Sequence, residues 1–339
     1  MFINATVREQ LDALELTKQL KVDSKGKTDA QTLPFFEREL EQVLTTTYER
    51  KFPELAMANG DVIPISSEVD EGAETYTYYM YEPTGIARFM TAYADADMPM
   101  VSIRGAKVTA PVEPMEVGYA YTTRDIRNAA FARRPLDQKL AVAARRAHDQ
   151  RVHITGLWGR EDLGLSGFVN NPNITVADAP AGAGGGGNPE YWVNKTPDEI
   201  VADIAMVIDG VETLTNKVEM VTDVAISNPL FLYIRRTRLG TIGESKTILT
   251  YIREVWPNVN FYGLIDLQAS NSLGNLDEDC MIGYARDAEK CSLEIPMPFK
   301  QYPVQQDGLK FKVPTESSMG GVKCPYPLSI YRLDGIGSN

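Results

Sequence analysis

The string GTIGESKT at residues 240–247 has the spacing closest to a catalytic motif. Gly240, Lys246 and Thr247 come within one substitution of the G-x-x-x-x-G-K-[ST] loop that binds nucleotide phosphates. The residue before the lysine is Ser245, whereas a phosphate loop has glycine there so that the backbone can turn and present its N–H groups. The preceding YIRRTRL carries three arginines and lacks the pattern of a buried strand. We interpret the string as a loop that leads into a helix, with Ser245 as N-cap.

Two other groups consist of residue types that can bind metals. NLDED at 275–279 opens like a calcium loop, but its sixth position is Cys280 instead of glycine and its twelfth is Arg286 instead of glutamate. This pattern favours a solvated acidic turn. His148 and His153, the only histidines, lie five residues apart, whereas two ligands on one helical face need a spacing of three or four. We expect them at the surface or at an interface.

Cys280, Cys291 and Cys324 are an odd number of thiols without C-x-x-C spacing. This count and spacing predict three reduced, partly buried thiols rather than a disulfide framework or a zinc site. No thiol stands next to a base, and histidines are scarce, so acid–base and nucleophilic catalysis have no visible centre. The sequence therefore predicts no catalytic residue, no cofactor-binding residue and no metal ligand.

Composition limits the classes of partner. The chain has 339 residues, of which 43% are hydrophobic and 24% charged, as in folded soluble proteins of one or two domains. No run of about 18 apolar residues is present, which predicts no membrane span, and the first residues lack a secretory signal. The net charge of −12 argues against broad nucleic-acid binding, but it does not exclude a protein that lies beside DNA without adhering to it.

The elements that would position these residues include two long helices in the middle of the chain. Pro135 opens the longer one, with arginines around its apolar stripe. We expect that stripe to contain Leu136, Leu140, Ala144, Ala147 and Ile154. In TPDEI, Thr196 is the predicted N-cap of the second helix and Glu199 completes a capping box. Its expected buried face consists of Ile200, Ile204, Val207, Ile208, Val211 and Leu214. VEMVTDVAIS (218–227) then predicts a strand and SNPL a turn.

Extended segments lie at both ends of this helical region. ETYTYYMYEPTG (74–85) and AKVTAPVEPMEVGYAYT (106–122) flank a long excursion, which predicts a projecting hairpin with a role in function or in contact with a neighbour. The last fifty residues are rich in proline and predict edge strands. The glycine-rich APAGAGGGGNPE (179–190) predicts a flexible loop. The polar first 30 residues contain a weak stripe at Val7, Leu11 and Leu14, and predict a segment that is disordered or lies along a partner. The fold class predicted is α+β.

This order of elements resembles that of tailed-phage major capsid proteins with the Hong Kong 97-like fold, in particular an encapsulin-related subfamily once catalogued as a domain of unknown function. The resemblance extends over nearly the whole chain, and GLSGFVNNPN (164–173) matches the turn that follows the spine helix in that family. It implies six segments: an N-terminal arm at 1–45, a connection into the P domain at 46–72, an E-loop hairpin at 73–118, a P domain with spine helix and following loop at 119–195, an A domain at 196–275, and return strands of the A and P domains at 276–339.

The resemblance also implies a function and a set of partners. Copies of the chain would form pentamers and hexamers that close into an icosahedral shell around double-stranded DNA, in a virion assembled in the host cytoplasm, without sequence-specific DNA contacts and without a membrane. Portal, decoration and scaffolding proteins are the other partners of such shells. Some family members cross-link an E-loop lysine, for which Lys107 is the sole hairpin candidate here; we expect non-covalent assembly. Two alternatives remain: an encapsulin-type compartment shell, and a nucleotide-binding enzyme that uses Lys246.

Overall fold

The structure is a computed structural model that describes residues 52–89, 99–132, 136–184, 187–240, 246–269 and 276–337. The chain divides into two units, residues 1–53 and 54–339, and every described helix and strand lies in the second. The predicted N-terminal arm, including the stripe at Val7, Leu11 and Leu14, lies outside the described residues. No helix in the described part of the chain is both long and apolar enough to cross a bilayer.

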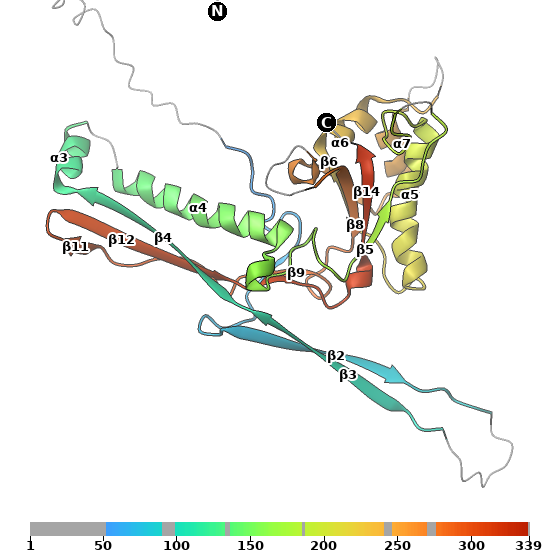
Figure 1. Cartoon of the computed structure of the whole chain (residues 1–339), viewed down its shortest axis with the longest axis horizontal. Coiled ribbons are helices and arrows are strands. Elements are labelled where there is room, and N and C mark those ends of the chain that lie inside the picture. Colours follow the sequence, from blue (N-terminus) through green and yellow to red (C-terminus); the bar gives the residue numbers. More distant parts are fainter. Residues whose placement is uncertain are drawn as a thin grey trace, which may run out of the picture. The chain divides into compact units, whose positions relative to one another are not determined.

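A five-stranded sheet joins strands from distant parts of the sequence, as the α+β prediction required (Figure 1). Its order is β5 (Thr175–Asp178), β14 (Ile330–Gly337), β8 (Asp279–Tyr284), β6 (Asp223–Ser227) and β7 (Asn260–Leu264). The outer pairs β5–β14 and β6–β7 are parallel, whereas β14–β8 and β8–β6 are antiparallel. All described residues of β6 and β8 are buried, because separate clusters of apolar side chains cover the two faces of the sheet.

Three helices belong to this sheet: α5 (Pro197–Leu214), α6 (Asn228–Arg236) and α7 (Ile248–Val255). The capping box predicted at the start of α5 is present, since the Thr196 hydroxyl accepts from the Glu199 backbone and the Glu199 carboxylate accepts from the Thr196 backbone. The predicted buried face of α5 is confirmed except for Leu214, which is exposed. The turn predicted at SNPL is wrong, because Asn228–Leu230 already form the first turn of α6. Of VEMVTDVAIS, only its second half is strand.

The long helix α4 (Leu136–Trp158) confirms the helix predicted from residue 135 and lies along β4 and β12 (Figure 1). A four-stranded antiparallel sheet places β12 at its centre. It consists of β4 (Glu113–Thr122), β10 (Met297–Gln301), β11 (Gln305–Asp307) and β12 (Lys310–Met319). The predicted stripe of α4 is partly wrong: Ala147 is exposed, and the buried line instead runs through Ala144, His148 and Val152.

The remaining elements are short, apart from one hairpin. A three-stranded sheet has the order β1 (Ile65–Ser66), β9 (Ser292–Glu294) and β13 (Gly321–Lys323). Helix α3 (Thr123–Phe131) follows β4, and single 3₁₀ turns are η1 (Glu161–Leu163), η2 (Ile265–Leu267) and η3 (Pro327–Ser329). Strands β2 (Thr75–Thr84) and β3 (Ser102–Pro111) pair antiparallel as a long two-stranded ribbon (Figure 1).

Candidate assembly surfaces

The β2–β3 hairpin is fixed to the rest of the unit at its base. The Tyr76 ring is buried there, and its hydroxyl donates to the Gly320 carbonyl oxygen at 3.1 Å. A Cβ at Gly320 would lie 2.8 Å from the Tyr76 ring, so glycine at 320 allows the ring to pack against the backbone. Burial raises the pKa of Tyr76, which keeps the hydroxyl a hydrogen-bond donor. The strand-like run of tyrosines therefore begins at an anchored residue.

The two faces of the hairpin differ in exposure. Because side chains alternate along a strand, Tyr76, Tyr78 and Met80 share one face, which is buried or half-buried. The opposite face, here called the outer face, carries Tyr79, Tyr81 and, by the strand register, Ile103. Their exposed fractions are 61%, 70% and 69%, and the rings of Tyr79 and Tyr81 stack with centroids 6.4 Å apart.

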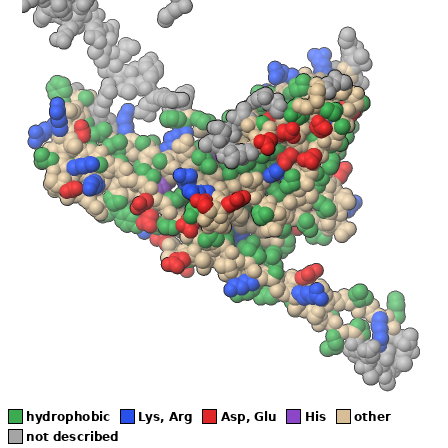
Figure 2. All heavy atoms as spheres, in the orientation of Figure 1, with side chains coloured by type: hydrophobic (Ala, Val, Ile, Leu, Met, Phe, Trp, Pro, Cys, Tyr) green, Lys and Arg blue, Asp and Glu red, His purple; other side chains and the backbone are tan. Residues whose placement is uncertain are grey.

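The hairpin beyond Tyr81 is also apolar and exposed. Further large hydrophobic side chains at the surface are Ile86, Phe89, Met100 and Val101. Figure 2 shows hydrophobic side chains interspersed with charged ones along this ribbon. So many large apolar side chains exposed on one projecting hairpin mark a contact with another molecule. Lys107 is exposed on the same outer face, opposite Tyr79 in the register.

A second exposed apolar region lies at α3. Thr122 and Asp125 form a capping box at its start, and Thr123 N–H donates to the Leu309 carbonyl oxygen at 3.0 Å. None of the nine described residues of α3 is buried, and the side chains of Ile126 and Phe131 face solvent. A short helix held by its cap and by so little packing is stable chiefly when a partner covers its apolar side.

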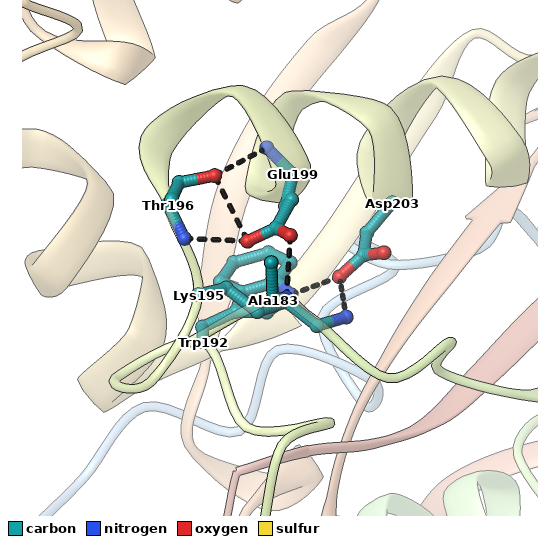
Figure 3. A network of polar contacts seen from close by, with 6 residues as sticks. All are labelled: Ala183, Trp192, Lys195, Thr196, Glu199 and Asp203. Carbon is teal, nitrogen blue, oxygen red and sulfur yellow. Dashed lines mark hydrogen bonds and ion pairs between the residues drawn. The ribbon is translucent and has the colours of Figure 1, made fainter. Parts of the chain in front are cut away.

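The glycine-rich segment before α5 is held by a polar network (Figure 3). Trp192 Nε1 donates to Asp203 Oδ2 at 2.8 Å, and Lys195 Nζ donates to the same oxygen at 2.5 Å. Glu199 Oε1 accepts from the Ala183 N–H at 2.7 Å. A Cβ at Gly184 would meet the Asn194 carbonyl oxygen, so this glycine permits a close backbone approach. The loop predicted to be flexible is therefore attached to α5 through several residues that the composition does not reveal.

The ion pair at the centre of this network is almost completely buried, with side-chain exposures of 1% for Lys195 and 2% for Asp203. Burial raises the pKa of the Asp203 carboxyl, and the hydrogen bond and charge of Lys195 oppose that shift. A buried pair stabilises only while both partners remain, because removing one leaves an uncompensated charge or an unsatisfied polar group. Its role here is structural: it attaches Trp192 and the preceding loop to α5.

Lys246 does not lie in a phosphate-binding arrangement. Its ammonium pairs with Glu254 at 2.6 Å, and both side chains are more than half exposed. The helix after it is capped by Thr247, whose hydroxyl accepts from the Thr250 N–H, so the cap predicted at Ser245 is wrong. The segment before the motif belongs to helix α6 and not to a strand. Residues 241–245 lie outside the described residues.

Both histidines are buried, so the prediction of surface histidines is wrong. His148 contacts the Ser317 hydroxyl through Nδ1 at 2.7 Å and the Thr315 hydroxyl through Nε2 at 3.0 Å. His153 Nδ1 accepts from the Met57 N–H at 3.2 Å, and its Nε2 lies 3.1 Å from an Asp266 carboxylate oxygen. Their partners come from strands and loops far away in sequence. Each ring is therefore part of core packing on α4.

The other predicted sites are also structural. In NLDED, Asp277 and Glu278 are exposed as expected, but Asp279 is buried and accepts from the Ser227 hydroxyl at 2.7 Å. Cys280, Cys291 and Cys324 are free thiols and are buried. Within the described ranges, no group of three or more His, Cys, Asp or Glu side chains is arranged to hold a metal ion. The candidates for function that remain are the exposed apolar surfaces. The run of tyrosines at 76–81 was the feature of the sequence that indicated the one on the hairpin.

Comparisons with known proteins agree with this emphasis on surfaces. The model of a family described as Major capsid protein matches residues 85–336. No curated protein matches the chain. Among solved structures, the fold is similar to the capsid of Myoviridae Phage XM1, at 18% identity and a TM-score of 0.73 over 88% of this chain and 98% of that one.

Two further solved structures share the fold at lower identity. A structure from Gordonia phage Cozz has 10% identity and a TM-score of 0.57, covering 93% of this chain and 97% of that one. The capsid of an empty GTA particle has 10% identity and a TM-score of 0.59, covering 92% of this chain and 100% of that one. At these identities the likeness is one of fold.

Proposed function

Since the chain belongs to the major capsid protein family, the structural shell proteins of tailed bacteriophages with the Hong Kong 97-like fold, we propose that its copies close into an icosahedral shell of pentamers and hexamers around double-stranded DNA. The observation that carries the proposal is the outer face of the hairpin. Tyr79, Tyr81 and Ile103 form an apolar surface that the described part of the chain leaves open. Burying one such side chain is worth about 1.5–3 kcal/mol, so three of them supply several kcal/mol to each contact between neighbours.

The proposed division of the chain follows the same reasoning. We assign the hairpin as the E-loop, α4 with the four-stranded sheet as the P domain, and the five-stranded sheet with α5 to α7 as the A domain. The pairing of β4 with β12 supports an E-loop that ends near Val112 instead of residue 118. The pairing of β5 and β14 supports counting both with the A domain. The arm at 1–45 is proposed on the resemblance of sequence alone.

The proposed interior contact with DNA is non-specific and weak. A net charge of −12 favours repulsion of the phosphate backbone over adhesion, so the genome would be confined and not bound. Portal, scaffolding and decoration proteins are proposed as partners, and assembly is proposed to occur in the host cytoplasm. We propose that the chain has no enzymatic activity, because the candidate residues Lys246, His148 and His153 are engaged in structural contacts.

Assembly of the full chain tests the proposal. Purified protein should sediment as a hollow particle, or as pentamers and hexamers that convert into one, because several modest contacts per subunit reinforce one another. Electron microscopy of the sedimenting fractions then shows whether the particles are closed shells. A monodisperse 37.6 kDa species that persists at high concentration and with crowding agents would contradict the proposal.

A further inference from the structure

Two of the three cysteines lie opposite each other at the end of a strand pair. Strands β9 and β13 are antiparallel, with Leu293 opposite Val322 and Ser292 opposite Lys323. One more step in this register brings Cys291 opposite Cys324. Residues directly opposite in an antiparallel pair place their side chains on the same face. Both thiols belong to the same apolar cluster as Leu293 and Val322, which agrees with that placement.

The hydrogen-bond pattern shows what kind of pair they form. Leu293 N–H donates to the Pro64 carbonyl oxygen, and Val322 N–H donates to the Ser166 carbonyl oxygen, so these two opposed residues exchange no bond. Hydrogen-bonded and non-bonded pairs alternate along such a ladder, which makes Cys291 and Cys324, two steps on, a non-bonded pair. The Cys291 N–H donates to Asp287, as this assignment requires.

Non-bonded pairs are the closer of the two kinds. Their Cα atoms lie about 4.5 Å apart, inside the range of roughly 4.4–6.8 Å that a disulfide spans. The thiols of Cys291 and Cys324 also hydrogen-bond to each other. This contact and a hydrogen bond from the Tyr326 N–H hold the pKa of the Cys324 thiol below its usual value, whereas the same contact and burial raise the pKa of Cys291. Cys324 is therefore the thiol of the pair that is more readily present as the thiolate.

Cys324 is also the more accessible to solvent of the two thiols. Cys291 has an exposed fraction of 0% and Cys324 of 8%. The residues on either side of Cys324, Lys323 and Pro325, line a groove of about 1110 Å³ together with Tyr78 and Tyr326. Cys324 itself does not line the groove, so a small disulfide must reach its sulfur between these two neighbours.

We propose that Cys291 and Cys324 form an intramolecular disulfide when the protein meets a small disulfide donor such as oxidised glutathione. The Cys324 thiolate attacks one sulfur of the donor, a Cys324–glutathione disulfide forms, and one glutathione thiolate leaves. The Cys291 sulfur, after losing its proton to solvent, attacks the Cys324 sulfur and releases the second glutathione. Two protein thiols are oxidised and one glutathione disulfide is reduced to two thiols, so electrons balance.

The cross-link would close the chain into a loop that begins just before β9 and ends just after β13. That loop contains β10, β11 and β12; β10 and β11 each pair with β12, and β12 also pairs with β4. The disulfide would thus fix the base of this sheet covalently to the apolar cluster. Virions leave the reducing host cytosol, and oxidising conditions outside it are those in which disulfides persist.

Thiol counting on the full-length protein tests the proposal. Reduced protein, unassembled and assembled, is incubated with oxidised glutathione, then denatured and alkylated. We expect free thiols to fall from three to one, with a Cys291–Cys324 cross-linked peptide identified by mass spectrometry and Cys280 left alkylated. Addition of a reductant should restore all three thiols.

Two variants separate the proposed pairing from other oxidation. Cys280→Ala, the matched control, should still form the cross-link, whereas Cys291→Ser should stop at a glutathione adduct on Cys324. Persistence of all three thiols in both forms of the wild-type protein would overturn the proposal. A cross-link that includes Cys280 would overturn it as well. Neither result depends on whether shells form.

Discussion

In the five-stranded sheet every described residue of β6 and β8 is buried, whereas none of the ten described residues of β3 in the hairpin is. Both regions contain valine, isoleucine, alanine and tyrosine, although β2 and β3 together hold only one valine and one isoleucine. Their surroundings differ. Helices and loops of the same chain cover both faces of the sheet, but the described part of the chain covers the hairpin only towards the base of its inner face.

This difference separates two kinds of stability. The sheet is complete within one subunit, so its apolar contacts contribute to the folding of the monomer. The outer face of the hairpin gains nothing from folding, because Tyr79, Tyr81 and Ile103 remain in water. Its apolar area contributes only when another molecule covers it. Substitutions in the two regions should therefore change different measurements.

The largest effect we expect follows from removing the apolar outer face. The triple substitution Tyr79→Ser, Tyr81→Ser and Ile103→Ser should abolish particle formation, because it removes most of the apolar area offered to a neighbour. Subunit stability should change by less than about 0.5 kcal/mol for each exposed position. Sedimentation measures assembly, and denaturant unfolding of the unassembled chain measures stability.

Two controls sharpen this result. Val142→Ser removes an exposed apolar side chain on α4, away from the hairpin, and should leave assembly intact. Ile204→Ala removes a buried side chain of α5 and should lower subunit stability by about 2–5 kcal/mol. Normal shells from the triple variant would show that the outer face is not an assembly surface.

The second effect concerns the buried ion pair between Lys195 and Asp203 at helix α5. Asp203→Ala leaves the Lys195 ammonium buried without its partner and removes the acceptor of the Trp192 indole N–H. We expect the free energy of unfolding to fall by about 3–5 kcal/mol. Chemical denaturation of the unassembled chain provides the measurement. The double variant Asp203→Leu with Lys195→Met should recover much of the loss, and no recovery would show that the charge is not the cause.

Features set by residues close together in the sequence could be predicted, whereas contacts between distant segments of the chain could not. Thr196 and Glu199 lie three residues apart, so their capping box is visible in the string itself. The burial of His148 depends on Ser317 and Thr315, which β12 brings alongside α4 from more than 160 residues away. The pairing of Cys291 with Cys324 likewise needs the β9–β13 register, which cysteine spacing does not reveal.

The third effect is a pH dependence of stability from His148. Burial lowers the pKa of His148 below 6.5, while the nearby Asp149 opposes the shift. The unfolded chain therefore binds the proton more readily, so the stabilising contribution is complete above the unfolded pKa and is lost as the pH falls from about 6.5 towards the folded pKa. The slope reaches at most about 1.4 kcal/mol per pH unit. Unfolding titrations from pH 7 downward should show a smaller slope for His148→Gln, and equal slopes would contradict the assignment.

The smallest effect should come from Lys246, the residue that looked most catalytic in the sequence. Its only charge partner in the described structure is Glu254, and an exposed ion pair of this kind is worth about 0–1 kcal/mol. Lys246→Ala should therefore leave assembly and thermal stability nearly unchanged, and Glu254→Ala, the matched control, should do the same. Equilibrium dialysis with ATP and magnesium should detect no binding to either form. Micromolar binding that disappears in Lys246→Ala would instead show that the 240–247 loop binds a nucleotide. The contrast between a self-contained sheet and an exposed hairpin would then no longer account for the function of the chain.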